Sequence, residues 1–287
     1  MKNCKKHFIV ALIVLFLGQI LAPKMSRAQI IEVGASAGLS YYMGDINPKK
    51  PFNQSQIGFG MLVRYYSNTR WAFRLAYSNL QLNGSDDKSN YRPERGLAFK
   101  TNVHDLALIA EFNFYDYFTG SKRNALSPYL FGGISALYFN PKAEDGTELC
   151  NVNTDVESYS SLSSDGTSKY SKLAMSIPFG VGVKYSLGPK LGIAFEWRWD
   201  YAFTDWLDDC HAYYPLYTHN DNFAPYADPT GFTADENGDN NDKYVQRGNK
   251  SNNDWYGYLN FSIVYKFVLP GSDDCHRGAY KNSYKNY

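Results

Sequence analysis

Apolar and polar residues alternate along most of the chain with a period of two, which is the spacing of side chains on a β-strand. The run from Ile31 to Met43 places apolar residues at odd positions and mostly small or polar residues at even positions. Similar runs recur to the end of the chain. The pattern predicts eight strands, which cover the alternating runs at 31–43, 57–65, 71–77, 106–114, 129–139, 173–185, 191–203 and 259–267.

These runs favour a membrane-spanning barrel over a soluble fold. Most reach the length of about 9–11 residues that a tilted strand needs to cross a bilayer, whereas soluble strands average about 5–6. Their apolar faces end in aromatic residues, as a lipid-facing band requires. An open edge in lipid would leave backbone groups without partners, so the sheet must close. We predict an all-β, eight-stranded antiparallel transmembrane β-barrel over 29–269; a soluble β-sandwich or a secreted barrel is the alternative.

The connections between the predicted strands alternate between short and long. Outer-membrane barrels have short periplasmic turns and long extracellular loops. We therefore expect a Gram-negative outer membrane, with both ends of the mature chain in the periplasm. The expected short connections are 67–70, 115–127 and 188–190. The expected long ones lie near Asn47 and at 83–100, 140–172 and 206–254.

The N-terminus has the pattern of a secretory signal peptide. Three lysines precede an apolar stretch at 8–22, and a small-x-small cleavage site ends at Ala28. We predict that 1–28 is removed. This leader carries five basic residues and no acidic one, so the remaining chain holds 24 basic and 28 acidic residues, a net charge of −4.

Composition excludes several classes of protein. An aromatic content of 17% argues against an unstructured chain. A mean hydropathy of −0.44 argues against a bundle of membrane helices. A formal net charge of only +1 for the whole chain argues against a nucleic-acid-binding protein.

Eight strands enclose a lumen that side chains can fill. Opposite charges on the inward faces should pair, because an unpaired buried charge is very costly. We interpret these charges as a structural network rather than a gated ion path, since a barrel of this size is too narrow for a porin channel. The predicted lumen network is Glu32, Arg64, Arg74, Asp105, Glu111, Lys184, Glu196, Arg198 and Asp200.

Three cysteines remain after the leader. Cys150 and Cys210 fall in predicted extracellular loops, where an oxidising exterior permits a disulfide if their Cα atoms are close enough. Cys275 is then left over near the C-terminus, either free or available to a partner protein.

Two features suggest metal binding, but neither has the arrangement that a site needs. Asp-Asp-Cys-His occurs at 208–211 and 273–276, which are predicted to lie on opposite sides of the membrane and so cannot share one ion. The segment 235–242 is rich in oxygen ligands, but its glycine is misplaced for an EF-hand. We predict no metal and no cofactor, and weak extracellular calcium binding at 235–242 stays open.

The residues after the last predicted strand form a short tail, 270–287. It is too short to build a folded core. Its basic and aromatic character suits docking on a partner and ordering there, with an idle tail as the alternative. The candidate docking residues are Cys275, Arg277, Tyr280, Lys281, Tyr284 and Lys285.

Five short blocks carry a family resemblance: Glu32–Asp45, Glu111–Tyr117, Pro128–Gly133, Ser176–Tyr185 and Phe203–Asp209. In this order they resemble the PorG family, outer-membrane barrels of the type IX secretion system of Bacteroidota. The resemblance implies a non-enzymatic component that contacts a periplasmic ring of a lipoprotein and its partner, PorK and PorN. Its surroundings would be outer-membrane lipid, with no nucleic acid and no small-molecule substrate. The acidic loop before the last strand and the tail depart from the family's pattern.

Two further functions remain open. The first is an autonomous structural barrel or adhesin that acts through its long extracellular loops. The second is a lipid-modifying barrel enzyme, for which His104 near the outer end of a strand is the candidate base. No nucleophile motif accompanies His104, so we predict that the protein is not an enzyme.

Overall fold

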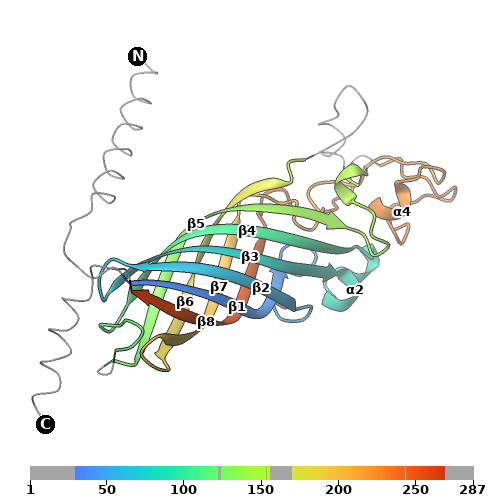
Figure 1. Ribbon diagram of the computed structural model, residues 1–287. Coiled ribbons are helices and arrows are strands. Elements are labelled where there is room, and N and C mark those ends of the chain that lie inside the picture. The colour runs from blue at the N-terminus through green and yellow to red at the C-terminus, as the bar shows by residue number, and fades with distance from the viewer. Residues whose placement is uncertain (1–29, 122–123, 153, 156–169, 243, 269–287) are drawn as a thin grey trace, which may run out of the picture. The chain divides into compact units, whose positions relative to one another are not determined.

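The computed structural model describes residues 30–121, 124–152, 154–155, 170–242 and 244–268. Eight strands form a closed antiparallel barrel in which each strand pairs with the next along the chain and β8 closes on β1 (Figure 1). This confirms the predicted fold class. The strands are β1 (Ile30–Met43), β2 (Gln56–Tyr66), β3 (Trp71–Ser85), β4 (Ala98–Asn113), β5 (Leu126–Lys142), β6 (Leu173–Ser186), β7 (Leu191–Ala202) and β8 (Trp255–Val268).

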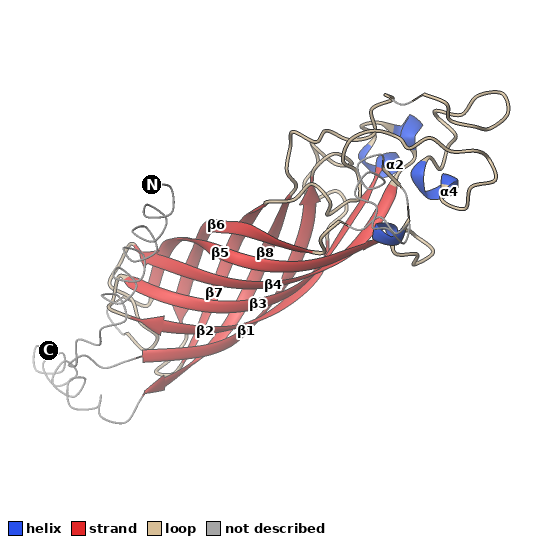
Figure 2. Ribbon diagram, turned by 90° about the horizontal axis from the view of Figure 1, so that it is seen from above, coloured by secondary structure: helices blue, strands red, loops and turns tan. Residues whose placement is uncertain are grey.

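The connections differ at the two ends of the barrel, as Figure 2 shows. We call one end the long-loop end; its connections are 44–55, 86–97, 143–172 and 203–254. We call the other the short-turn end; its connections are 67–70, 114–125 and 187–190. The long loops contain the short helices α2 (Asp86–Ser89), η1 (Pro93–Arg95), η2 (Leu149–Asn151) and α4 (Ala224–Ala227). In the described part of the chain, no helix is both long and apolar enough to cross a membrane.

The outward faces of the strands form an apolar band around the barrel. Ile57 on β2 is 64% exposed, Leu108 on β4 is 55% exposed and Phe195 on β7 is 53% exposed. Soluble monomers rarely expose continuous apolar patches larger than a few hundred Å². A band of this kind needs lipid around it, and exposed aromatic residues at its margins match the girdles of membrane barrels. Those aromatic residues include Tyr65, Trp71, Tyr185 and Tyr265 toward the short-turn end, and Tyr77, Tyr138 and Trp255 toward the long-loop end.

Strands β3, β4 and β5 continue beyond this band toward the long-loop end. Their outward residues there are polar and their inward residues are apolar, the reverse of the pattern within the band. We call this section the polar extension. Its half-buried or exposed outward residues are Asn79, Gln81, Asn83, Lys100, Asn102, Asn140 and Lys142. Its buried inward residues include Leu80, Leu82, Phe99, Val103, Leu137 and Phe139.

The polar extension corrects the expectation of a long loop over 83–100. The strands reach Ser85 and resume at Ala98, so the connection covers only 86–97. The backbone ladder continues through this region, with Asn83 opposite Lys100 and Leu82 opposite Thr101. The strands persist because their side chains stop facing lipid and instead enclose an apolar core, like those of a soluble barrel.

Candidate functional site

The lumen within the apolar band holds a network of buried charges centred on Glu111 of β4. Its carboxylate lies 2.8 Å from Arg64 Nε, 3.0 Å from Arg74 Nε and 2.5 Å from Lys184 Nζ. These cations come from β2, β3 and β6. Glu111 therefore links strands that are not neighbours in the sheet.

Two further carboxylates complete this network. Arg64 Nη1 donates to Glu32 Oε2 at 2.8 Å, and Arg74 Nη1 donates to Glu196 Oε1. The Tyr129 hydroxyl also donates to Glu196. Each of the three arginine and lysine side chains is at most 3% exposed, so the pairing takes place away from water.

A second cluster lies nearer the long-loop end. Arg198 Nη2 donates to Asp105 Oδ1 at 2.8 Å and to Asp200 Oδ1 at 2.6 Å. The Tyr256 hydroxyl donates to Asp105 Oδ2 at 3.0 Å. All nine charged residues that the sequence pointed to are buried in the lumen, and they form these two clusters.

Sequence reasoning missed several lumen residues. Lys266 of β8 is buried and donates its Nζ to the carbonyl oxygen of Thr119. Its position on the polar face of the last alternating run could have identified it. Tyr129 and Tyr256 were missed because a tyrosine in a strand pattern reads as apolar, although its hydroxyl needs a partner when buried.

The short-turn end of the lumen is closed by the connection 114–125. Tyr117 and Thr119 are buried there, and Thr119 Oγ1 donates to Glu32. Gly120 N donates to Ser186 Oγ at 2.7 Å. Gly120 has φ +95°, and a Cβ at this position would stand 2.5 Å from the carbonyl oxygen of Pro189. The sequence predicted a short connection over 115–127, and the structure has one at 114–125. The sequence did not indicate that residues of this connection would be buried in the barrel mouth.

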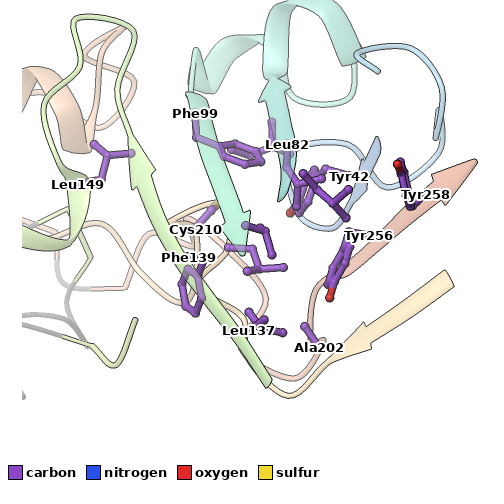
Figure 3. Close-up of a cluster of buried hydrophobic side chains, with 14 of the residues drawn as sticks. Tyr42, Leu82, Phe99, Leu137, Phe139, Leu149, Ala202, Cys210, Tyr256 and Tyr258 are labelled. Atoms are coloured by element: carbon purple, nitrogen blue, oxygen red, sulfur yellow. The ribbon is translucent and has the colours of Figure 1, made fainter. Parts of the chain in front are cut away.

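The long-loop end is closed by a cap with its own apolar core. Figure 3 shows the inward side chains of the polar extension packing with residues of the loops, including Leu149 and Cys210. Leu207 is fully buried, and its carbonyl oxygen accepts a hydrogen bond from Thr101 Oγ1 at 2.7 Å. The segment 204–210 therefore lies across the barrel opening. This segment overlaps one of the five blocks that carry the family resemblance.

Between the two closures, a small cavity of about 20 Å³ lies among Arg74, Glu196 and Arg198. That volume holds about one water molecule. A filled lumen with both mouths covered is not an open pore.

Two arginines tie the loops of the cap together. Arg95 donates to Asp86 at 2.6 and 2.7 Å and to the carbonyl oxygen of Asp45 at 3.1 Å. Arg95 also donates to the carbonyl oxygen of Arg247, and the Arg247 side chain donates to the carbonyl oxygen of Asp209. Three of the four long loops are joined in this way.

The disulfide that the loop positions permitted is absent. Cys150 and Cys210 are both free thiols and both are buried. Cys210 Sγ donates to the carbonyl oxygen of Arg247 at 3.3 Å, while Cys150 Sγ lies 3.7 Å from Asn140 Oδ1. Each thiol has its own polar contact, so the disulfide that the sequence left open is not formed.

The metal-ligating residue types are engaged in protein contacts. His211 Nδ1 lies 2.7 Å from Asp205 Oδ2. Asp235 Oδ1 accepts hydrogen bonds from the backbone of Asn237 and Asp239, as in a closed turn. Within the described segments, no group of three or more His, Cys, Asp or Glu residues is arranged to hold a metal ion.

His104 lies on the outer wall at the edge of the apolar band. Its Nδ1 is 2.8 Å from the Tyr77 hydroxyl, and its ring lies 6.2 Å from the rings of Tyr77 and Tyr138. These three side chains form one row of the aromatic margin.

Several expectations concern segments outside the described residues. They are the signal peptide at 1–28 and the tail at 270–287, the second Asp-Asp-Cys-His copy included. The candidate docking residues of the tail are Cys275, Arg277, Tyr280, Lys281, Tyr284 and Lys285.

The cap contains a buried group of carboxyls around Tyr42. The Tyr42 hydroxyl lies 2.5 Å from Asp208 Oδ2 and 2.9 Å from Asp254 Oδ1. One hydroxyl proton cannot serve two carboxylates, so a carboxyl in this group holds a proton. Burial, with the charge of Asp45 added, raises the pKa of Asp208 to about 7, and burial also raises the pKa of Asp254.

We expect the cap to loosen as pH rises from 5 to 8. The folded cap keeps a proton on Asp208 up to about pH 7, whereas an exposed aspartate loses it near 3.8. The free energy of unfolding of the cap is therefore highest at low pH. It falls by on the order of 2 kcal/mol between pH 5 and 8, as Asp208 in the folded cap loses its proton near pH 7. The rate of hydrogen exchange at backbone amides 205–210, corrected for intrinsic exchange rates at each pH, measures this loss of stability. Asp208→Asn should flatten the profile; an unchanged profile in that variant would assign the effect to another group.

Comparisons with known proteins complete this description. Among solved structures, the chain is similar to Neisserial surface protein A, with 13% identity, a TM-score of 0.40 and coverage of 83% of this chain and 97% of that one. Ail of Yersinia pestis, in complex with the heparin analogue sucrose octasulfate, has 11% identity and a TM-score of 0.40, with coverage of 84% of this chain and 100% of that one. A major outer membrane protein of Thermus thermophilus has 13% identity and a TM-score of 0.40, with coverage of 84% of this chain and 100% of that one. These likenesses concern the fold alone.

Among curated proteins, none matches the chain. A family profile matches residues 6–227, which reach from the predicted leader through seven of the eight strands and into the loop before β8. The chain therefore belongs to the family described as "Domain of unknown function (DUF6089)".

Proposed function

We propose that the protein is a non-enzymatic anchor in the outer membrane of a Gram-negative bacterium, serving a protein secretion machine like that of the PorG family. In this role it holds or organises a periplasmic ring built from a lipoprotein and its partner. The observation that carries the proposal is the sealed, charge-paired lumen. A barrel whose lumen holds buried, paired side chains and whose mouths are both covered supports a rigid fixture rather than a conduit.

The proposed contact surface is the short-turn end together with the tail. The described turns there present exposed polar groups, such as the Arg70–Asp116 ion pair at 2.6 Å with side chains 45% and 57% exposed. The predicted signal peptide and the even number of strands support a periplasmic location for this end. The basic, aromatic sequence of 270–287 suits docking on an acidic or apolar partner surface.

Affinity capture from gently solubilised outer membranes tests this role. We expect full-length protein to bring down a periplasmic ring lipoprotein, identified by mass spectrometry. A variant ending at Leu269 should lose it if the tail makes the contact. A matched variant lacking 219–238 should retain it, because Tyr217 and Asn240 pair across that gap and the variant keeps the segment 204–210 that lies across the barrel opening. Recovery of the barrel alone under the same conditions would count against the anchor role.

The cap supports a second candidate function, that of an adhesin or surface-binding barrel. The loop 203–254 is held to the barrel by buried contacts yet presents exposed side chains such as Phe232 and Tyr244. In this case the variant lacking 219–238 should lose binding to its surface ligand while the variant ending at Leu269 keeps it. The two candidates therefore predict opposite results for the same pair of variants.

A further inference from the structure

A cavity of about 360 Å³ opens on the outer wall where β1, β7 and β8 reach the long-loop end. This volume lies within the range of small-molecule sites, about 300–1,000 Å³. It is separate from the lumen and from the cap core. The residues that matter for its chemistry are Asp45, Tyr201, Ser251, Asn252, Asn253 and Trp255.

The lining combines neutral hydrogen-bonding groups with aromatic rings. Asn252 and Ser251 are exposed, and Asn253 Nδ2 donates to the Tyr201 hydroxyl at 2.9 Å. The Tyr201 and Trp255 rings lie 4.9 Å apart, centroid to centroid. Amides and hydroxyls both donate and accept, as sugar hydroxyls do, and aromatic faces pack on the C–H faces of a sugar ring.

The charge of the lining selects against an anionic ligand. None of the described residues that line this cavity is a lysine or arginine, whereas Asp45 contributes a carboxylate. Phosphate recognition relies on Arg or Lys side chains or on arrays of backbone amides. A neutral, polyhydroxylated group fits the cavity better.

The position of the cavity connects it to the lipid-facing surface. Trp255 and Tyr201 line the cavity and also belong to a connected array of rings on the outer wall of β6, β7 and β8. Phe179 lies 6.1 Å from Trp255 and 6.0 Å from Trp199, and Trp197 lies 4.3 Å from Trp199. Trp255 is 39% exposed and Phe179 is 40% exposed, so these rings face the acyl chains.

The loop that supplies Asp45 is also fixed to this wall. Phe52 packs on Tyr41 with ring centroids 4.6 Å apart and lies 6.1 Å from Trp197. Trp197 Nε1 donates to the Tyr41 hydroxyl at 2.8 Å. The polar cavity and the aromatic wall below it therefore form one continuous and well-supported surface.

We infer that this surface binds a membrane glycolipid, with one sugar of its head group in the cavity and its acyl chains on the aromatic wall. A lipid-borne sugar is favoured over a free saccharide because two residues of the cavity lining, Tyr201 and Trp255, also belong to the ring array of the outer wall. The inference needs the barrel to span a membrane, but it does not depend on the secretion role.

Native mass spectrometry of full-length protein in detergent tests the inference with three probes at equal concentration: the neutral glycolipid monoglucosyl diacylglycerol, its deacylated glucosyl glycerol, and phosphatidylethanolamine. We expect wild-type protein to bind the glycolipid at least about tenfold more tightly than the other two. Asn252→Trp fills the cavity from an exposed position and should weaken glycolipid binding about tenfold. Asn102→Trp, an exposed amide on the opposite wall, is the matched control and should bind as wild type does.

Heat-modifiable migration on gels verifies that both variants are folded before binding is measured. Equal glycolipid binding by wild type and Asn252→Trp would overturn the site. Equal affinity for the deacylated glucosyl glycerol would show that acyl chains take no part. Equal affinity for phosphatidylethanolamine would show that no sugar is recognised.

Discussion

Replacing Glu111 with alanine is expected to destabilise the barrel by about 3–5 kcal/mol, the cost of leaving partner charges buried without compensation. Glu111 is fully buried and contacts Arg64, Arg74 and Lys184. The two arginines keep Glu32 and Glu196 as partners. Among the described residues, Glu111 is the only carboxylate that forms an ion pair with Lys184, which would then keep only Asn113 Oδ1 at 3.0 Å. Urea unfolding of the protein in vesicles, followed by tryptophan fluorescence, measures the change.

The matched control is Asp116→Ala, which removes the exposed ion pair with Arg70. Exposed pairs contribute about 0–1 kcal/mol, so the control should unfold close to wild type. If the two variants lose similar stability, the lumen network is not what holds the barrel together. Glu111→Gln should fall between them because it keeps the shape and one acceptor while removing the charge.

Placing arginine at position 108 should cost about 2–4 kcal/mol, as expected for a cation near the middle of a bilayer. Leu108 is 55% exposed on β4, between Leu75 of β3 and Ile134 of β5. The same substitution at Asn102, on the same face of the same strand, should change stability by no more than about 0.5 kcal/mol. Asn102 belongs to the polar extension, where the strand has left the lipid.

The same unfolding assay in vesicles compares these two variants. In detergent micelles the difference should shrink, since a micelle adapts more easily than a bilayer to a local charge. Equal costs at 102 and 108 in vesicles would place the membrane boundary elsewhere. A small cost at both positions would contradict a membrane-spanning band at this depth.

The sequence was sufficient to predict the eight strands and the burial of the lumen charges. The reason is that strand side chains alternate strictly, so Glu32 or Arg198 within an otherwise apolar run must face away from lipid. The pairing within the network was not predictable. Contacts such as Glu111 with Lys184 cross the lumen between β4 and β6, and their geometry depends on the strand stagger after closure.

The polar extension escaped prediction because the alternation continues while its polarity reverses. The apolar positions move from odd to even between Tyr77 and Leu80, so the apolar face of β3 appears to end at Tyr77. The sequence did contain a signal for the polar extension: the apolar residues move from odd to even positions while the alternation itself continues without a break. The connection 114–125 and the segment 204–210, which close the two ends of the barrel, carry no periodic pattern of apolar and polar residues. Irregular segments are shaped by tertiary contacts, such as that of Thr101 with Leu207.

The lumen network also bears on how the barrel closes during assembly. Together with Lys266, the nine residues of the network give ten lumen charges, five of each sign, from seven of the eight strands. A slip of two residues between neighbouring strands keeps every side chain on its own face, so the hydrophobic effect alone discriminates poorly against it. Such a slip moves a charge about 6.6 Å along the strand. Glu111 would then leave its cations unmatched in the lumen. Pairing across the lumen thus acts as a register check, and a misaligned barrel carries a penalty that a purely apolar lumen could not impose.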